Sequence, residues 1–126
     1  MENLRVVLQT RRLTRDGITS GRVSASNQHF VEEMPGIPPE KNSRTFLARD
    51  MAGGPLYRLK YNRRMEGLPP KQTITDLRRF FREHGVQPGD RITLYKENGN
   101  EVMLMGILIS PLYVIHIERV NEVADG

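Results

Sequence analysis

Two short stretches of the sequence are rich in arginine and lysine, whose side chains are able to bind phosphate. Residues 11–22 hold four arginines and one acid, and residues 58–79 hold seven basic residues and two acids. Their charges sum to +8, so the rest of the chain carries −4, because the formal net charge of the whole is +4. Positive charge confined to two segments of an otherwise acidic chain favours a localised polyanion site. The alternative is that arginine-rich strands merely keep a small domain soluble.

The residue spacings that a catalytic or metal site needs are missing. Mg²⁺-dependent nucleases commonly place a lysine two residues after an acid, but the four lysines here follow two prolines, an arginine and a leucine at that spacing. His29, His84 and His116 are far apart, and no cysteine or paired carboxylate stands at ligand spacing. There is also no G-x-x-x-x-G-K-S/T phosphate loop. We expect no catalytic residue, no metal and no cofactor, so the chain should not be an enzyme by itself.

Length and composition indicate one domain over residues 1–126. The chain has 126 residues and no cysteine, which fits a reducing compartment. Its longest apolar run, residues 102–109, is interrupted by Gly106 and falls far short of the ~20 residues of a membrane span. Nothing at the N-terminus is typical of a signal peptide. We expect a soluble, cytoplasmic protein with no membrane partner.

Short strands are expected to position the two basic segments. Apolar and β-branched residues predict strands over residues 4–13, 22–24, 45–48 and 56–61. Residues 14–21 contain Asp-Gly and Ser-Gly steps and predict a turn or arm. Ser26 is expected to cap a short helix that extends to Met34. Residues 62–72 contain Pro69-Pro70 and are expected to be a long connection without helix or central strand.

A helix and a β-hairpin are predicted over residues 75–105. Thr75 is expected to cap the helix with Asp76 in its first turn, and Gly85 to end it in a left-handed conformation. The apolar face of this helix carries Leu77, Phe80, Phe81 and His84. Residues 92–95 and 102–105 predict two strands, and Asn98-Gly99 between them predicts a hairpin turn. After a break at Ser110-Pro111, residues 113–118 predict the last strand.

This pattern predicts a mainly β fold of about seven mostly antiparallel strands with two short helices. The predicted strands and helices do not alternate as they do in a parallel α/β sheet. A barrel-like fold is therefore favoured. The pattern alone leaves a pseudobarrel, an OB-fold and a swapped-hairpin barrel open.

A motif in the last third of the chain resembles the B-three type of DNA-binding pseudobarrel. Its elements are Leu77, Phe80, Gly85-Val86 and Gly89-Asp90, followed by a strand. The family usually has Trp where this chain has Leu77. A bacterial branch of this fold serves restriction endonucleases, and the chain is similar to the EcoRII-type N-terminal effector domain, which recognises DNA. The resemblance implies a DNA-binding pseudobarrel and a catalytic nuclease part elsewhere in the same chain or on another chain.

The resemblance also implies two arms that grip the major groove of double-stranded DNA. The first follows Arg12-Leu13-Thr14 and contains the turn at residues 16–21. The second follows a Tyr-Asn-x-Arg-x-x-Gly run at residues 61–67 and ends before Ile74-Thr75. Residues 71–73 depart from the relative's base-reading cluster, so a different DNA sequence is expected.

Candidate DNA-binding residues follow from side-chain chemistry on these arms. Arg and Lys donate to guanine O6 and N7, Gln and Asn pair with adenine, and Ser, Thr and backbone N–H groups reach phosphates. The candidates are Arg12, Arg15, Asp16, Thr19, Ser20, Arg22, Ser24, Asn62, Arg63, Arg64, Lys71, Gln72 and Thr73. Each has a structural alternative: Asp16 and Ser20 in shaping a turn, Arg22 as a solvated strand residue, Asn62 in capping a turn.

Two other functions compete with duplex recognition. An OB-like domain that binds single strands needs exposed aromatic rings as stacking platforms, but the chain has eight aromatics and no Trp, and Phe80 and Phe81 are expected in the core. A protein-interaction module without a nucleic-acid role is the third possibility.

Overall fold

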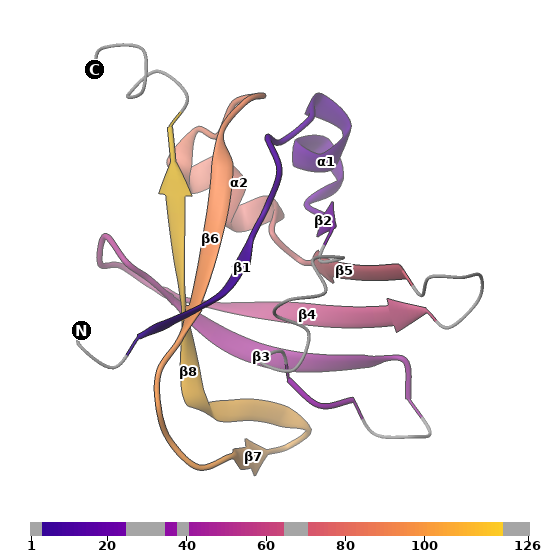
Figure 1. Cartoon of the computed structure of the whole chain (residues 1–126), viewed down its shortest axis with the longest axis vertical. Helices are drawn as coiled ribbons and strands as arrows, with labels where there is room; N and C mark the ends of the chain where they lie inside the picture. Colours follow the sequence, from indigo (N-terminus) through magenta and orange to yellow (C-terminus); the bar gives the residue numbers. More distant parts are fainter. Residues whose placement is uncertain (1–3, 25–34, 38–40, 65–70, 120–126) are drawn as a thin grey trace.

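In the computed structural model, one eight-stranded sheet curls into a half-barrel with two short helices beside it (Figure 1). The structure describes residues 4–24, 35–37, 41–64 and 71–119. The strands are β1 (Arg5–Gln9), β2 (Val23–Ser24), β3 (Ser43–Asp50), β4 (Leu56–Arg64), β5 (Lys71–Thr75), β6 (Arg91–Lys96), β7 (Val102–Leu104) and β8 (Ile107–Glu118), and the helices are α1 (Arg15–Ser20) and α2 (Arg78–His84). This architecture confirms the mainly β pseudobarrel predicted from the sequence.

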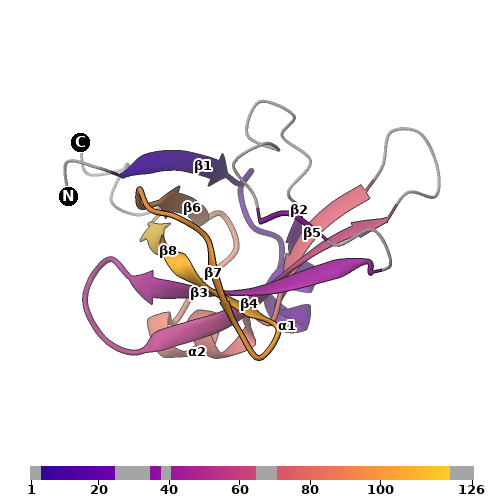
Figure 2. The same ribbon diagram turned by 90° about the horizontal axis from the view of Figure 1, so that it is seen from below.

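The sheet has the strand order β1-β6-β8-β3-β4-β5-β2, with β7 paired to β8 off this path. All neighbours are antiparallel except β3 and β8, which run parallel. Strands β3, β4 and β5 cross the direction of β1, β6 and β8 (Figure 1), and the two helices lie together on one side of the sheet (Figure 2). Strand β8 therefore joins two differently directed halves of one sheet.

The core is built from the strand faces that alternate inward and from one face of α2. On the β3–β4 pair, Phe46 lies opposite Leu59 and Ala48 opposite Tyr57, and all four side chains are buried. Helix α2 buries Phe80 and Phe81, and the Phe80 ring meets the Tyr57 ring edge-on at 5.2 Å. The helix ends at Gly85, whose φ of 56° is left-handed. The predicted apolar face and end of this helix are confirmed.

The start of α2 differs from the prediction. Thr75 is the last residue of β5, and Asp76 has a φ of 69°, which turns the chain between strand and helix. The helix N-cap is Leu77, and no side chain makes a capping hydrogen bond there. The Leu77 backbone N–H instead donates to the Gly21 carbonyl, at 3.0 Å. A tertiary contact with the α1 segment thus replaces the local cap that the sequence predicted.

The predicted hairpin between residues 92–95 and 102–105 is wrong. Strand β6 pairs with β1 and β8, whereas β7 pairs with β8 alone, so Asn98-Gly99 does not close a hairpin. The hairpin is β7–β8, and its turn is Met105-Gly106, with φ values of 51° and 80°. Strand β8 runs unbroken through the cis Ser110–Pro111 bond, where the sequence predicted a break. Its length lets the first half bind β7 and the second half bind β6.

Two further segments also correct the sequence reading. Residues 14–21 fold as α1 rather than a turn, because the Thr14 hydroxyl accepts from the Gly17 N–H at 3.1 Å and Gly21 ends the helix with a φ of 70°. Residues 62–64 continue β4, and residues 71–75 form β5, so both described ends of the supposed connection are strand. The helix expected from Ser26 to Met34, with His29, lies outside the described residues. Within the described ranges, no helix is long and apolar enough to cross a membrane.

Candidate nucleic-acid interface

Strands β2, β5 and β4 bring residues of the two predicted arms into one row. Ser24 pairs with Thr73, and Thr73 pairs with Asn62 on its other side. The next row toward the helices, Val23, Ile74 and Tyr61, is buried. In the opposite direction along β4 and β5, Arg63 pairs with Gln72, and Arg64 then pairs with Lys71. We call this end of the three strands the arm edge: Ser24, Arg63, Arg64, Lys71 and Thr73.

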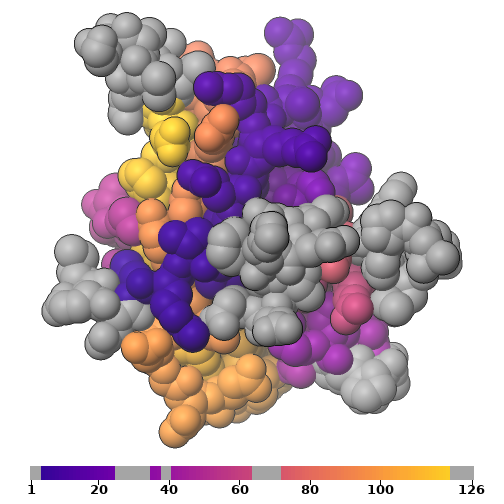
Figure 3. Space-filling view, viewed as in Figure 1, coloured from indigo at the N-terminus to yellow at the C-terminus, as the bar shows by residue number. Residues whose placement is uncertain are grey.

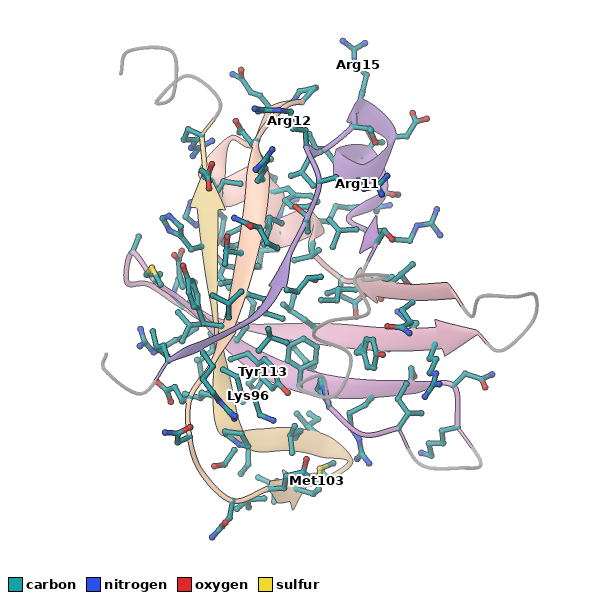
Figure 4. All side chains as sticks on the ribbon, viewed as in Figure 1. Arg11, Arg12, Arg15, Lys96, Met103 and Tyr113 are labelled. Atoms are coloured by element: carbon teal, nitrogen blue, oxygen red, sulfur yellow. The ribbon has the colours of Figure 1, made fainter. Side chains whose placement is uncertain are left out.

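The remaining candidates lie around α1, at the other end of β5. Arg15, Asp16, Thr19 and Ser20 belong to α1, all exposed, and Arg12 precedes it. Helix α1 packs where β5 gives way to α2, since the Cβ position of Gly21 lies 2.7 Å from the Arg78 nitrogen. Arg11, Arg12 and Arg15 project from this end of the molecule (Figure 4). Strand β5 spans about 13 Å from Lys71 at the arm edge to Thr75 near α1, as four steps of ~3.3 Å.

Most α1 candidates face solvent, but two make local contacts. The Arg12 guanidinium donates to the Gly89 carbonyl at 3.1 Å, and the Ser20 hydroxyl donates to the Gly17 carbonyl at 3.3 Å. Arg22 is exposed between α1 and the arm edge, and its backbone N–H donates to the Gly17 carbonyl at 3.0 Å. Arg12 therefore holds the turn at Gly89 with one nitrogen while the residue stays exposed.

Two candidates on β4 and β5 are engaged inside the fold. Gln72 is 7 % exposed, and its Oε1 accepts from the Tyr61 hydroxyl at 3.2 Å. The half-buried Asn62 donates through Nδ2 to the Thr75 hydroxyl at 3.0 Å. Burial raises the pKa of Tyr61 although Arg63 opposes the shift, so the hydroxyl stays protonated and donates to Gln72. Gln72 therefore supports the β4–β5 pair from inside the fold, whereas Asn62 lies half-buried on the other face of β4. Base contacts by these two residues stay a prediction.

Several other cations are held by the fold itself. Arg49 pairs with Glu97 at 3.3 Å, and Arg119 reaches Asp90 at 3.4 Å and also donates to the His84 carbonyl. Lys96 lies over the Tyr113 ring, 5.9 Å from its centroid (Figure 4). These side chains stabilise the sheet and the end of α2, so they are poor candidates for a nucleic-acid contact.

A polar cluster on α2 likewise serves the fold. The Tyr57 hydroxyl donates to Glu83 at 2.6 Å, and Arg79 pairs with the same carboxylate at 2.9 Å. The hydrogen bond from Tyr57, and to a smaller extent that from Arg79, lowers the pKa of Glu83. Burial, together with the neighbouring Glu83, raises the pKa of Tyr57. His84 Nε2 lies 2.5 Å from Asp50. Within the described residues, no group of three or more His, Cys, Asp and Glu side chains could hold a metal ion.

Further cations that the sequence analysis did not select as candidates also face solvent, and three of them lie beside the candidates. Arg11 is exposed beside Arg12, and Arg58 (exposed) and Lys60 (half-buried) lie on the face of β4 that also carries Asn62. The strict alternation along residues 56–61 was the signal that could have found Arg58 and Lys60, because every second residue of a strand shares a face.

Comparisons with known proteins give the fold. The sequence matches no protein-family model and no curated protein sequence. The solved Arabidopsis FUS3–DNA complex is 20 % identical, with a TM-score of 0.68 over 91 % of this chain and 98 % of that one. The complex of the Arabidopsis thaliana transcription factor LEC2 with DNA is 18 % identical, with a TM-score of 0.71 over 90 % and 93 %. This chain has the B-three pseudobarrel fold. Neither structure bears on the resemblance to restriction endonuclease domains.

Proposed function

We propose that this chain recognises double-stranded DNA sequence-specifically through the major groove. The observation that carries the proposal is the arm edge, where the ends of β2, β4 and β5 meet in one register with three cations at Arg63, Arg64 and Lys71. Two solved structures of similar fold are complexes with DNA, which supports the same class of partner for this chain.

The separation of the two basic groups fits a duplex. The major groove of B-DNA is about 12 Å wide, close to the ~13 Å length of β5. With the arm edge in the groove, the α1 group reaches the phosphates along its border. Arg63, Arg64 and Lys71 are then the candidates for base contacts. Arg12, Arg15, Thr19, Ser20 and Arg22 contact phosphates, since a backbone contact needs charge or a hydroxyl and no base-specific geometry.

The finer assignment is the recognition domain of a restriction endonuclease. It rests on the Gly85-Val86 and Gly89-Asp90 motif and on the two arm sequences, not on the plant proteins of similar fold. The catalytic part would lie elsewhere in a longer chain or on a separate chain.

Selection from a random duplex library at two salt concentrations tests the DNA proposal. We expect an enriched short motif that persists at the higher salt, because base contacts survive when the phosphate contribution weakens. Retention of duplexes without a motif, or a preference for single strands, would refute it; the latter would favour the OB-like alternative. Indifference to all nucleic acid at low salt would leave a protein-interaction module.

Methylation of the selected motif separates the restriction role from general recognition. A restriction system must distinguish its host's methylated DNA, and a methyl group in the major groove lies where Arg or Lys would contact the base. We expect methylation at a contacted base to weaken binding strongly. Binding that ignores methylation at every position of the motif would remove the restriction assignment and leave duplex recognition intact.

A further inference from the structure

The β7–β8 hairpin exposes four consecutive apolar side chains. Val102 is 49 % exposed, Met103 40 %, Leu104 57 % and Met105 92 %. This segment forms the lower extremity of the molecule in Figure 3, on the side opposite α1. Scattered apolar residues on a surface need no explanation, but a contiguous apolar strand usually marks a contact surface.

Strand β7 also has a free edge. Among the described strands it pairs with β8 alone. Antiparallel pairs alternate between hydrogen-bonded and non-bonded residues, and a two-residue turn with two positive φ values closes on a bonded pair. Leu104 and Ile107 form that closing pair, so the backbone N–H and C=O of Met103 point away from β8. An extended strand is the partner that these groups can bind.

The free edges of β1, β2 and β7 differ in how they are protected from pairing. Strand β1 has a register shift between Val6 and Leu8 and carries Arg5, and β2 is only two residues long. Charges, bulges and short length are the usual devices that keep sheet edges from pairing. Strand β7 is short and has a register shift at its start, but it carries no charge and no proline across its three residues.

The turn residue Met105 supplies an independent argument. Its φ of 51° is left-handed, a conformation that is costly for a bulky side chain, and Asn-Gly is the favoured pair for this turn type. A methionine here strains the turn while placing an almost fully exposed apolar side chain at its tip. Strained residues cluster at functional sites, so this strained and exposed apolar residue supports a contact role for the tip of the hairpin.

We propose that β7 is the interface through which a second copy of this chain binds, edge to edge and antiparallel. A two-fold axis at Met103 sets Val102 of one copy opposite Leu104 of the other. Each apolar residue of β7 then faces an apolar residue of the same strand in the second copy. Two chains of net charge +4 repel each other, but this hairpin lies at the end away from Arg11, Arg12 and Arg15 (Figure 4). Near β7, Arg44 contacts the Met103 sulfur at 3.3 Å and Glu101 is exposed, so opposite charges flank the strand.

Such a dimer is weak and leaves the DNA-binding surfaces free. A three-residue strand with its turn buries less than the ~1,200 Å² of small stable interfaces, which places the contact among transient ones. The arm-edge strands β2, β4 and β5 take no part in this contact, since β7 pairs only with β8 among the described strands. The inference does not depend on the proposed function, because self-association is measured without DNA.

Sedimentation equilibrium from ~10 µM to ~1 mM tests the proposal in the range where weak dimers form. We expect the wild-type chain to approach dimer mass at the upper end. Leu104→Lys should weaken association at least ~tenfold, as at a central interface position. Leu56→Lys is the matched control, because Leu56 is 49 % exposed on β4 and gives the same change of charge.

The variant Met105→Asn separates a loss of association from a loss of folding stability. Asparagine suits the left-handed position, so this variant should unfold at a higher temperature than the wild type and yet associate less. A monomer at every concentration would overturn the proposal. So would a dimer that Leu104→Lys and Met105→Asn leave intact, or one that Leu56→Lys weakens equally.

Discussion

Replacing Gln72 by Met should destabilise the fold without changing the DNA sequence that the chain selects. Gln72 is 7 % exposed and Tyr61 3 % exposed, and the 3.2 Å hydrogen bond between them is the one described contact of the Tyr61 hydroxyl. Methionine keeps the length of the side chain and removes the acceptor. The Tyr61 hydroxyl then stays buried without a partner, which costs about 1–3 kcal/mol.

The loss is large enough to measure by urea unfolding. A domain of this size unfolds with an m-value of about 2 kcal/mol per molar urea, so a loss of about 2 kcal/mol lowers the midpoint by about 1 M. Tyr61→Phe removes the donor and should cost about 1 kcal/mol by itself. The double variant should cost less than the sum, with a coupling energy of about 1 kcal/mol.

The competing outcome would refute the structural assignment of Gln72. Suppose that Gln72→Met left the unfolding midpoint unchanged and altered one position of the selected motif. Gln72 would then face the DNA, and the hydrogen bond to Tyr61 would contribute nothing to stability. Additive costs of Gln72→Met and Tyr61→Phe in the double variant would also contradict the direct contact.

Three further outcomes follow from the geometry. Arg15→Ala should weaken the binding of all duplexes alike and reduce the slope of log affinity against log salt by about 1. Arg63→Ala should instead relax the preference at one base position, at a cost of about 1–3 kcal/mol. Equal effects of the two variants on the selected motif would contradict the division into phosphate and base contacts. Gly21→Ala should destabilise the protein by about 1–2 kcal/mol or more in thermal unfolding, because φ is 70° and the new Cβ would lie 2.7 Å from the Arg78 nitrogen; an unchanged unfolding temperature would show that the α1–α2 junction yields. The pKa of Glu83 is lowered in the folded state by the hydrogen bonds from Tyr57 and Arg79, so its carboxylate stabilises the fold above its unfolded pKa of ~4.3, and that stability is lost as pH falls through the lower folded pKa. Glu83→Gln should reduce the fall in the free energy of unfolding below about pH 5, measured by urea titration. An unchanged pH dependence of this free energy would contradict the lowered pKa of Glu83.

The sequence predicted the elements whose information is local. Gly85 ends α2 because glycine adopts the left-handed conformation of a helix end without steric cost, and Phe80 and Phe81 are buried because they lie on the apolar face of the helix. The strand pattern also sufficed for the mainly β class, because period-two alternation survives in β3 and β4. These features needed no knowledge of what each segment packs against.

The features that failed were decided by distant partners. The Asn98-Gly99 turn is a strong local signal, but β8 pairs with both β6 and β7, so the local hairpin never forms. Thr75 is a good cap by type, but β4 holds it as a strand residue and Asn62 donates to its hydroxyl. The DNA contact of Gln72 stays a prediction, but its burial and its hydrogen bond to Tyr61 depend on the pairing of β5 with β4, which the local sequence does not specify.

The central place of β8 bears on how the chain reaches its native state. The β3–β8 partners stand 62 to 65 residues apart in sequence, and β8 is the link between the β1–β6 pair and the β3-β4-β5-β2 group. A chain emerging from the ribosome therefore holds two unfinished pieces of sheet until residues 107–118 arrive. Pairing across such separations makes folding slow, and in that interval the inner edges of β3 and β6 stand open to strands of other nascent chains. The arrival of β8, rather than the formation of any early hairpin, governs when this sheet becomes safe from aggregation.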